Sequence, residues 1–133
     1  MKELLVEDYM IKKVPYVKKT TPINTVVALM EKSRISGLPV VNDDQEVIGF
    51  LSQSRCIENF IQHVYHSEAT ETVEDVMRPD PFTIKDTDTI YQTIENLRNT
   101  AFNAFMVTRD NKLVGAITRT NVLKALSDAY GGK

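Results

Sequence analysis

The hydrophobic positions in the first half of the chain alternate between helical and strand spacing. Thr21-Pro22 is a favourable helix start, since Thr caps helices and Pro suits their first position. Apolar residues follow at helical spacing, at Ile23, Val26, Val27 and Met30. Two β-prone runs, 38–41 and 47–51, flank the turn residues 42–44 and predict a hairpin. Ser54 can cap a second helix with the apolar stripe Ile57, Phe60, Ile61 and Val64.

The second half of the chain repeats this order. Asp88 is the expected cap of a helix with apolar residues at Ile90, Ile94, Leu97 and Ala101. Runs 104–108 and 113–117 predict two strands joined through Asp110-Asn111, and Thr120 precedes a last helix that carries Leu123 and Leu126. Residues 66–71 are polar and predict a link, whereas 130–133 predict a frayed tail.

The order is the same because the sequence itself recurs. Val6-Glu7-Asp8-Tyr9-Met10 returns as Val73-Glu74-Asp75-Val76-Met77, 67 positions later, and the predicted strands return 66 positions later. Two similar units with one apolar face each can bury those faces against each other. The sequence therefore predicts two domains, 1–66 and 67–133, with the groove between them as the place for function.

Composition narrows the class of protein. The chain has 133 residues, of which 26% are charged and 42% hydrophobic, as in soluble globular proteins. A net charge of −2 argues against nucleic-acid binding, which needs a basic face. Cys56 is alone, so an intrachain disulfide is excluded, and no apolar stretch is long enough for a bilayer. With acidic residues near the N-terminus in place of a secretory signal, we expect a cytoplasmic protein without membrane contact.

The recurring motifs resemble the cystathionine β-synthase (CBS) domain. They are Val-Glu-Asp-x-Met, a Thr-Pro-Ile helix start, Gly37-Leu38-Pro39-Val40-Val41 and Gly49-Phe50-Leu51-Ser52, and the resemblance runs from about Val6 to Leu126. Two such domains in tandem resemble a CBS pair, or Bateman module. The resemblance implies an α+β fold of two βαββα repeats packed sheet to sheet about a pseudo-twofold axis. It also implies a regulatory, usually homodimeric protein that binds adenosine-containing ligands between its repeats.

In this family, a strand ending in Gly-x-x-Ser/Thr is followed three residues later by an acid. The hydroxyl and the free amides of a helix N-terminus favour phosphate, and a short acceptor one turn on can reach the ribose. Asn121 occupies the position of the acid here, which predicts weakened binding because an amide lacks charge-assisted bonds. Arg119 could reach phosphates, and Gly37 would let backbone approach a ring. The predicted nucleotide-binding residues are Pro15, Tyr16, Ile35, Ser36, Gly37, Ala116, Thr118, Arg119, Thr120 and Asn121, for AMP, ADP, ATP or S-adenosylmethionine.

The corresponding place in the first repeat is predicted to be degenerate. Arg55 stands where the acid is expected and has no acceptor, although it could meet a phosphate. By the resemblance, this second cleft would be formed by Ser52, Arg55, Phe82, Ala101, Phe102 and Asn103. We therefore expect one weak-to-moderate nucleotide cleft and one altered cleft.

Simpler interpretations compete with these roles. Thr118 and Asn121 could only cap a helix, Arg119 could be solvated, and Tyr16 and Phe102 could be core aromatics. His63 and His66 are three residues apart, but a solvated face is favoured over a metal site.

Two functions remain open and one is rejected. The first is a ligand-sensing module that regulates an enzyme or transporter in trans, which is expected on family analogy alone. The second is a dimeric interaction module with decayed clefts, for which Ala28 and Leu29 would offer apolar surface. An enzyme is rejected because the sequence has no Gly-rich phosphate loop, catalytic triad spacing or metal-ligand cluster.

Overall fold

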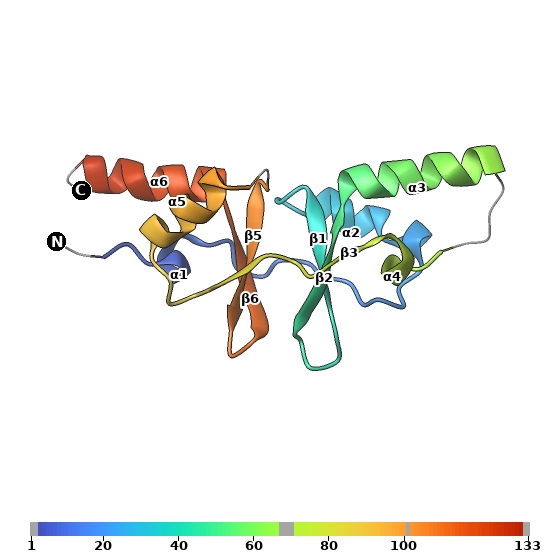
Figure 1. Cartoon of the computed structure of the whole chain (residues 1–133), viewed down its shortest axis with the longest axis horizontal. Coiled ribbons are helices and arrows are strands. Elements are labelled where there is room, and N and C mark those ends of the chain that lie inside the picture. The colour runs from blue at the N-terminus through green and yellow to red at the C-terminus, as the bar shows by residue number, and fades with distance from the viewer. Residues whose placement is uncertain (1–2, 67–70, 101, 132–133) are drawn as a thin grey trace. The chain divides into compact units, whose positions relative to one another are not determined.

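The structure, a computed structural model, describes residues 3–66, 71–100 and 102–131. Two compact units are present, and each is described by itself. The first-repeat unit is Val14–Pro81, and the second-repeat unit combines Met1–Lys13 with Phe82–Lys133. In each unit the helices lie to one side of the sheet (Figure 1).

The first-repeat unit contains a three-stranded sheet in the order β1-β2-β3, with both pairs antiparallel. Val17 adds a parallel bridge to Val40 at the β1 edge. The elements of this unit are the 3₁₀-helix η1 (Ile23–Thr25), α2 (Val27–Lys32), β1 (Gly37–Val41), β2 (Val47–Ser52), α3 (Gln53–His66), α4 (Val73–Val76) and β3 (Arg78–Pro79).

The second-repeat unit has the same plan with different strand lengths. Its sheet order is β4-β5-β6, where β4 is parallel and β6 antiparallel to β5, and Ile11 bridges to Ala116 in β6. The elements are α1 (Val6–Tyr9), β4 (Thr83–Lys85), α5 (Ile90–Arg98), β5 (Ala104–Arg109), β6 (Lys112–Thr118) and α6 (Arg119–Tyr130). The predicted mixed fold of two similar repeats is confirmed.

A short segment leads into each repeat, residues 3–13 before the first and residues 71–81 before the second, and we call these segments the lead-ins. Each lead-in is hydrogen-bonded within the unit of the other repeat. The Ile90 amide donates to the Leu4 carbonyl at 2.8 Å, and the Ile23 amide donates to the Glu71 carbonyl at 3.1 Å. These two bonds occupy equivalent positions in the repeats, so the exchange is mutual. Consequently, the compact units divide the chain at different places from the sequence repeat.

Two glycines make room for the exchanged lead-ins. At Gly115 in β6, a Cβ would lie 2.8 Å from Met10 Sδ and 2.5 Å from the Ile11 carbonyl oxygen. At Gly49 in β2, a Cβ would lie 2.5 Å from Met77 Sδ. The Val-Glu-Asp-x-Met and Gly-x-x-Ser/Thr motifs are thus contact partners across the exchange.

Each unit has its own apolar core, to which the exchanged lead-in contributes a fully buried valine. Val73 joins the first-repeat core with Leu38, Val40 and Leu51, and Val6 joins the second-repeat core. Burying one such side chain stabilises the fold by roughly 1.5–3 kcal/mol. The other fully buried residues of the second-repeat core are Ile90, Phe105, Val107, Ile117 and Ala125.

The predicted helix caps are wrong by one or two residues. Thr89, rather than Asp88, caps α5 by accepting a hydrogen bond from the Gln92 amide. Ser54, the other predicted cap, lies inside α3. Thr120 was expected to precede the last helix, but α6 begins at Arg119 and is capped by Thr118, so Thr120 lies inside the helix. Thr89 and Thr118 have extended backbone, which a capping residue requires.

The first predicted helix begins as η1 and becomes α2 only at Val27, without a side-chain cap. The predicted stripe of α3 also differs from the structure, since Ile57 is 60%, Ile61 47% and Val64 77% exposed. Cys56 is the residue of α3 that lies in the core, and Phe60 packs against that core half-buried.

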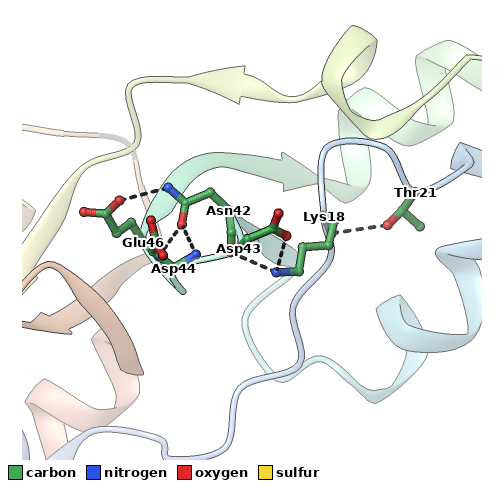
Figure 2. Close-up of polar contacts among 6 residues, drawn as sticks. All are labelled: Lys18, Thr21, Asn42, Asp43, Asp44 and Glu46. Atoms are coloured by element: carbon green, nitrogen blue, oxygen red, sulfur yellow. Dashed lines mark hydrogen bonds and ion pairs between the residues drawn. The ribbon is translucent and has the colours of Figure 1, made fainter.

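The β1–β2 turn is held by side chains, as Figure 2 shows. Asn42 Oδ1 accepts hydrogen bonds from the amides of Asp44 and Glu46, both at 2.9 Å. Lys18 Nζ donates to the Asn42 carbonyl at 2.8 Å and lies 3.4 Å from Asp43 Oδ1. This network ties the hairpin to the segment before η1.

Gly115→Ala is expected to destabilise the protein by about 1–3 kcal/mol, because the added methyl group would overlap Met10 and the Ile11 carbonyl. Denaturant unfolding measures the loss. Gly131→Ala is the control: its Cβ would lie 3.3 Å from the nearest heavy atom, and Gly131 has helical backbone. A change within about 0.5 kcal/mol is expected there. A Gly115→Ala protein of wild-type stability would contradict the close contact with the lead-in.

Candidate functional site

The turn from β6 into α6 positions the two central residues of the predicted nucleotide site. The Asn121 amide donates to Thr118 Oγ1 at 3.1 Å, and the Thr118 amide donates to Asn121 Oδ1 at 2.9 Å. This reciprocal pair is a capping box, so both residues cap α6, and their role in binding a nucleotide stays a prediction. Because Oδ1 is committed to the backbone, Asn121 offers a ligand its Nδ2 donors.

Arg119, between these residues, binds the end of the preceding helix. Its Nη2 donates to the carbonyls of Leu97, Thr100 and Phe102 at 3.2–3.3 Å. A cation at these carbonyls also complements the negative end of the α5 dipole. The guanidinium therefore fixes the α5–β5 connection, a role that the sequence did not suggest.

The other predicted residues of this unit differ in exposure. Ala116 is fully buried, and both its amide and carbonyl pair with Ile11, so it serves the sheet. Thr120 is exposed in the first turn of α6.

The remaining five predicted residues belong to the first-repeat unit. Ser36 has a φ of 64°, and its carbonyl accepts a hydrogen bond from the Gln53 amide. A Cβ at Gly37 would lie 2.6 Å from the Phe50 ring, so packing inside the unit already requires glycine there. Ile35 is buried, Pro15 half-buried and Tyr16 exposed. The predicted nucleotide set is thus distributed over both units.

The predicted degenerate set is also distributed over both units. Ser52 Oγ accepts a hydrogen bond from the Arg55 amide at 3.2 Å, as Thr118 does from Asn121. The Arg55 side chain extends to the end of α4, where Nε donates to the Val76 carbonyl at 2.6 Å. Arg55 therefore fastens the exchanged lead-in helix to α3.

The aromatic members of that set pack within the second-repeat unit. The Phe82 and Phe105 ring centroids are 4.9 Å apart, and Phe102 meets Phe105 edge-on at 6.4 Å. The Asn103 carbonyl accepts a bond from the Arg119 amide, and Ala101 lies outside the described residues. Phe102 is thus a packing aromatic, as the simpler interpretation held.

Two cavities open beside α3, and the sequence predicted neither. One, of about 240 Å³, is apolar and is lined by Val26, Val27, Met30, Glu31, Gln53, Cys56, Ile57 and Phe60. Burial raises the pKa of the Cys56 thiol, which disfavours the reactive thiolate. The other, of about 610 Å³, has a mixed lining that includes the polar residues Arg55, Asn59 and Glu71 and the apolar residues Ile61 and Val76.

The part of the chain that the structure describes holds no cluster of three or more His, Cys, Asp and Glu residues suited to a metal ion. Among the same residues, no helix combines the length and apolar character needed to cross a membrane.

Comparison with known proteins identifies the family. The CBS domain matches residues 6–61 and again residues 73–128. The uncharacterized protein MJ1232 of Methanocaldococcus jannaschii is 31% identical over 94% of this chain and 40% of its own length. CBSX1 of Arabidopsis thaliana, a chloroplastic CBS domain-containing protein, is 26% identical over 82% of this chain and 57% of its own. The chain thus spans about half the length of these relatives.

Solved structures share the fold. A crystal structure of CBSX2 in complex with AMP superposes with a TM-score of 0.80 at 26% identity, covering 96% of this chain and 98% of that one. An acetoin utilization protein (AcuB) of Vibrio cholerae gives a TM-score of 0.81 at 19% identity, over 98% and 95% of the two chains. With both repeats matched, the chain belongs to the CBS domain family and carries two CBS domains in tandem.

Proposed function

We propose that the chain is a regulatory module that senses an adenosine-containing ligand of the AMP, ADP or ATP type. The observation that carries the proposal is the Thr118–Asn121 capping box, which holds a hydroxyl and a short amide at the start of the 12-residue helix α6. The similarity to CBSX2, which was crystallised with AMP, supports an adenosine ligand.

The hydrogen-bonding state of Asn121 defines the expected strength of binding. Its Nδ2 can donate to a ribose oxygen, but it lacks the carboxylate oxygen that would accept both ribose hydroxyls. The Thr120 amide, in the first turn of α6, is a donor for phosphate. Binding is therefore weak to moderate. The contribution of Pro15, Tyr16, Ile35, Ser36 and Gly37 stays a prediction, as does a regulated enzyme or transporter in trans.

Thermal melts with AMP, ADP, ATP and S-adenosylmethionine test the proposal, because a ligand that binds only the folded state raises the melting temperature. At about a hundred times its dissociation constant, a ligand stabilises the fold by roughly 2.7 kcal/mol. Asn121→Asp is expected to bind the responding ligand more tightly, by roughly tenfold, through charge-assisted hydrogen bonds to the ribose. Unchanged melting with every ligand would refute the proposal.

Thr118→Ala removes the hydroxyl and is expected to abolish the ligand response. It also removes a cap, which costs about 1 kcal/mol without ligand. Ser52→Ala is the matched control, since Ser52 Oγ accepts the equivalent amide at the start of α3. It should lower stability comparably and keep the response. If both variants lost the ligand response equally, the loss would come from the missing helix caps and not from a lost contact with the ligand.

A second candidate function, a dimeric interaction module, is favoured by the outer face of α3. Ile57, Ile61, Val64 and Tyr65 are all exposed there, and Val27 in α2 is exposed as well. Contiguous exposed apolar groups mark protein interfaces. We propose that a second copy of this chain packs on this face. Of the surface predicted in α2, Ala28 is exposed, but Leu29 is half-buried against the core.

Ile61→Lys is expected to shift the protein from dimer to monomer, since a charge would be buried in the apolar contact. Light scattering coupled to size exclusion measures the mass. Asn24→Lys, which adds the same charge at an exposed position in η1, should leave the dimer intact. A monomeric wild-type protein at micromolar concentration would contradict this assignment.

A further inference from the structure

Arg119 joins the first turn of α6 to the α5–β5 connection, residues 99–103. Its amide donates to the Asn103 carbonyl at 3.3 Å. Its Nη2 donates to three carbonyls at the end of α5 and in the connection, those of Leu97, Thr100 and Phe102. Thr118 and Asn121, the capping box of α6, are the central residues of the proposed adenosine site. Arg119 therefore lies between that site and the connection, within the second-repeat unit.

The first repeat has the same backbone contact with a different side chain. By the repeat spacing, Gln53 is the counterpart of Arg119, and its amide donates to the Ser36 carbonyl at 3.2 Å. The equivalent connection is held from within, because Ser33 Oγ donates to the Gly37 carbonyl. A hydroxyl inside the connection thus does in the first repeat what a guanidinium from α6 does in the second.

The hydroxyl that could play this part in the second repeat is not used. Thr100 follows its counterpart Ser33 by 67 positions, and its Oγ1 is buried without a hydrogen bond among the described residues. A buried hydroxyl without a partner is destabilising. The second repeat therefore lacks a bond inside the connection and has instead the bonds of Arg119, which tie the connection to another element.

We propose that Arg119 is a positioning residue that couples the proposed adenosine site to the α5–β5 connection. The guanidinium stays on the carbonyls, where it complements the negative end of the α5 dipole, and it does not bind a ligand phosphate. It holds the first turn of α6 in place for the ligand contacts of Thr118 and the Thr120 amide. A ligand that fixes this turn also fixes the connection, and the coupling is reciprocal.

This inference rests on the proposed function and adds the segment through which binding is transmitted. The connection carries Phe102 and Asn103, which the family resemblance assigns to the second, altered cleft. The coupling therefore leads from one predicted cleft to residues of the other, along the hydrogen bonds of Arg119.

Arg119→Gln installs the residue of the first repeat and is expected to weaken adenosine and AMP by the same factor, roughly fivefold. Both ligands depend equally on the first turn of α6, because Arg119 contacts neither the ribose nor the phosphate. Isothermal titration calorimetry measures the two dissociation constants. A loss confined to AMP would overturn the proposal, since it would assign Arg119 to the phosphate. Unchanged constants for both ligands would overturn it as well.

Arg98→Gln is the matched control, because it removes the same charge from the last turn of α5, where Arg98 pairs with Glu95. It leaves the carbonyl bonds of Arg119 intact, so adenosine and AMP should bind as they do to the wild type. A loss as large as that of Arg119→Gln would overturn the proposal, since any lost positive charge would then have the same effect.

Hydrogen exchange of the wild-type chain tests the coupling without relying on a variant. Saturating AMP is expected to slow amide exchange roughly fivefold in peptides that cover residues 97–105, as well as in the first turn of α6. In Arg119→Gln saturated with AMP, exchange should slow in the first turn of α6 but not in the connection. Protection of the connection that persists in Arg119→Gln would contradict its transmission through Arg119.

The wild-type outcomes also separate the coupling from the proposed function. A chain that binds neither adenosine nor AMP would refute the coupling together with an AMP site. Binding of AMP that protects the first turn of α6 and leaves exchange in the connection unchanged would refute the coupling alone.

Discussion

The mutual exchange of lead-in segments is the constraint on which both units depend. Each unit completes its core with a valine that belongs to the other repeat in sequence, and equivalent backbone bonds, Ile90 to Leu4 and Ile23 to Glu71, hold the two segments. Neither repeat can close its core from its own residues, because the positions filled by Val6 and Val73 would be empty cavities. Each repeat therefore needs a segment of the other to complete its core.

The side chain that lies beside each lead-in has the opposite charge in the two units, Lys19 in one and Asp86 in the other. In the second-repeat unit, Asp86 is 4% exposed, and its carboxylate binds Arg109, which also lies 3.6 Å from Glu7 of the lead-in. This bond raises the pKa of Arg109. In the first-repeat unit, the lead-in residue Glu74 instead meets Lys19, at the position equivalent to Asp86. Backbone bonds fix the geometry in both units, so the side chains were free to diverge.

Periodicity predicted the strands and most of the helices because buried faces impose it. It misplaced the caps, since Asp88 and Thr89 are both good capping residues and only backbone conformation chooses between them. It could not tell that Ile61 faces outward, because an apolar helix stripe marks a core and an interface alike. The motif located Thr118 and Asn121, but the bond that commits Asn121 Oδ1 to the backbone requires coordinates. Asn59 carried a signal that comparing the repeats could have revealed, since Ala125 is its counterpart.

The larger cavity beside α3 and the exchange of lead-in segments meet at one residue. Glu71 presents its side chain to Asn59, while its carbonyl accepts the Ile23 amide that holds the lead-in. Arg55 adds a second link, because it joins the same cavity to the end of α4. Two side chains of α3, Asn59 and Arg55, therefore hold the lead-in of the first-repeat unit. The proposed adenosine site lies elsewhere, at Thr118 and Asn121 where α6 begins.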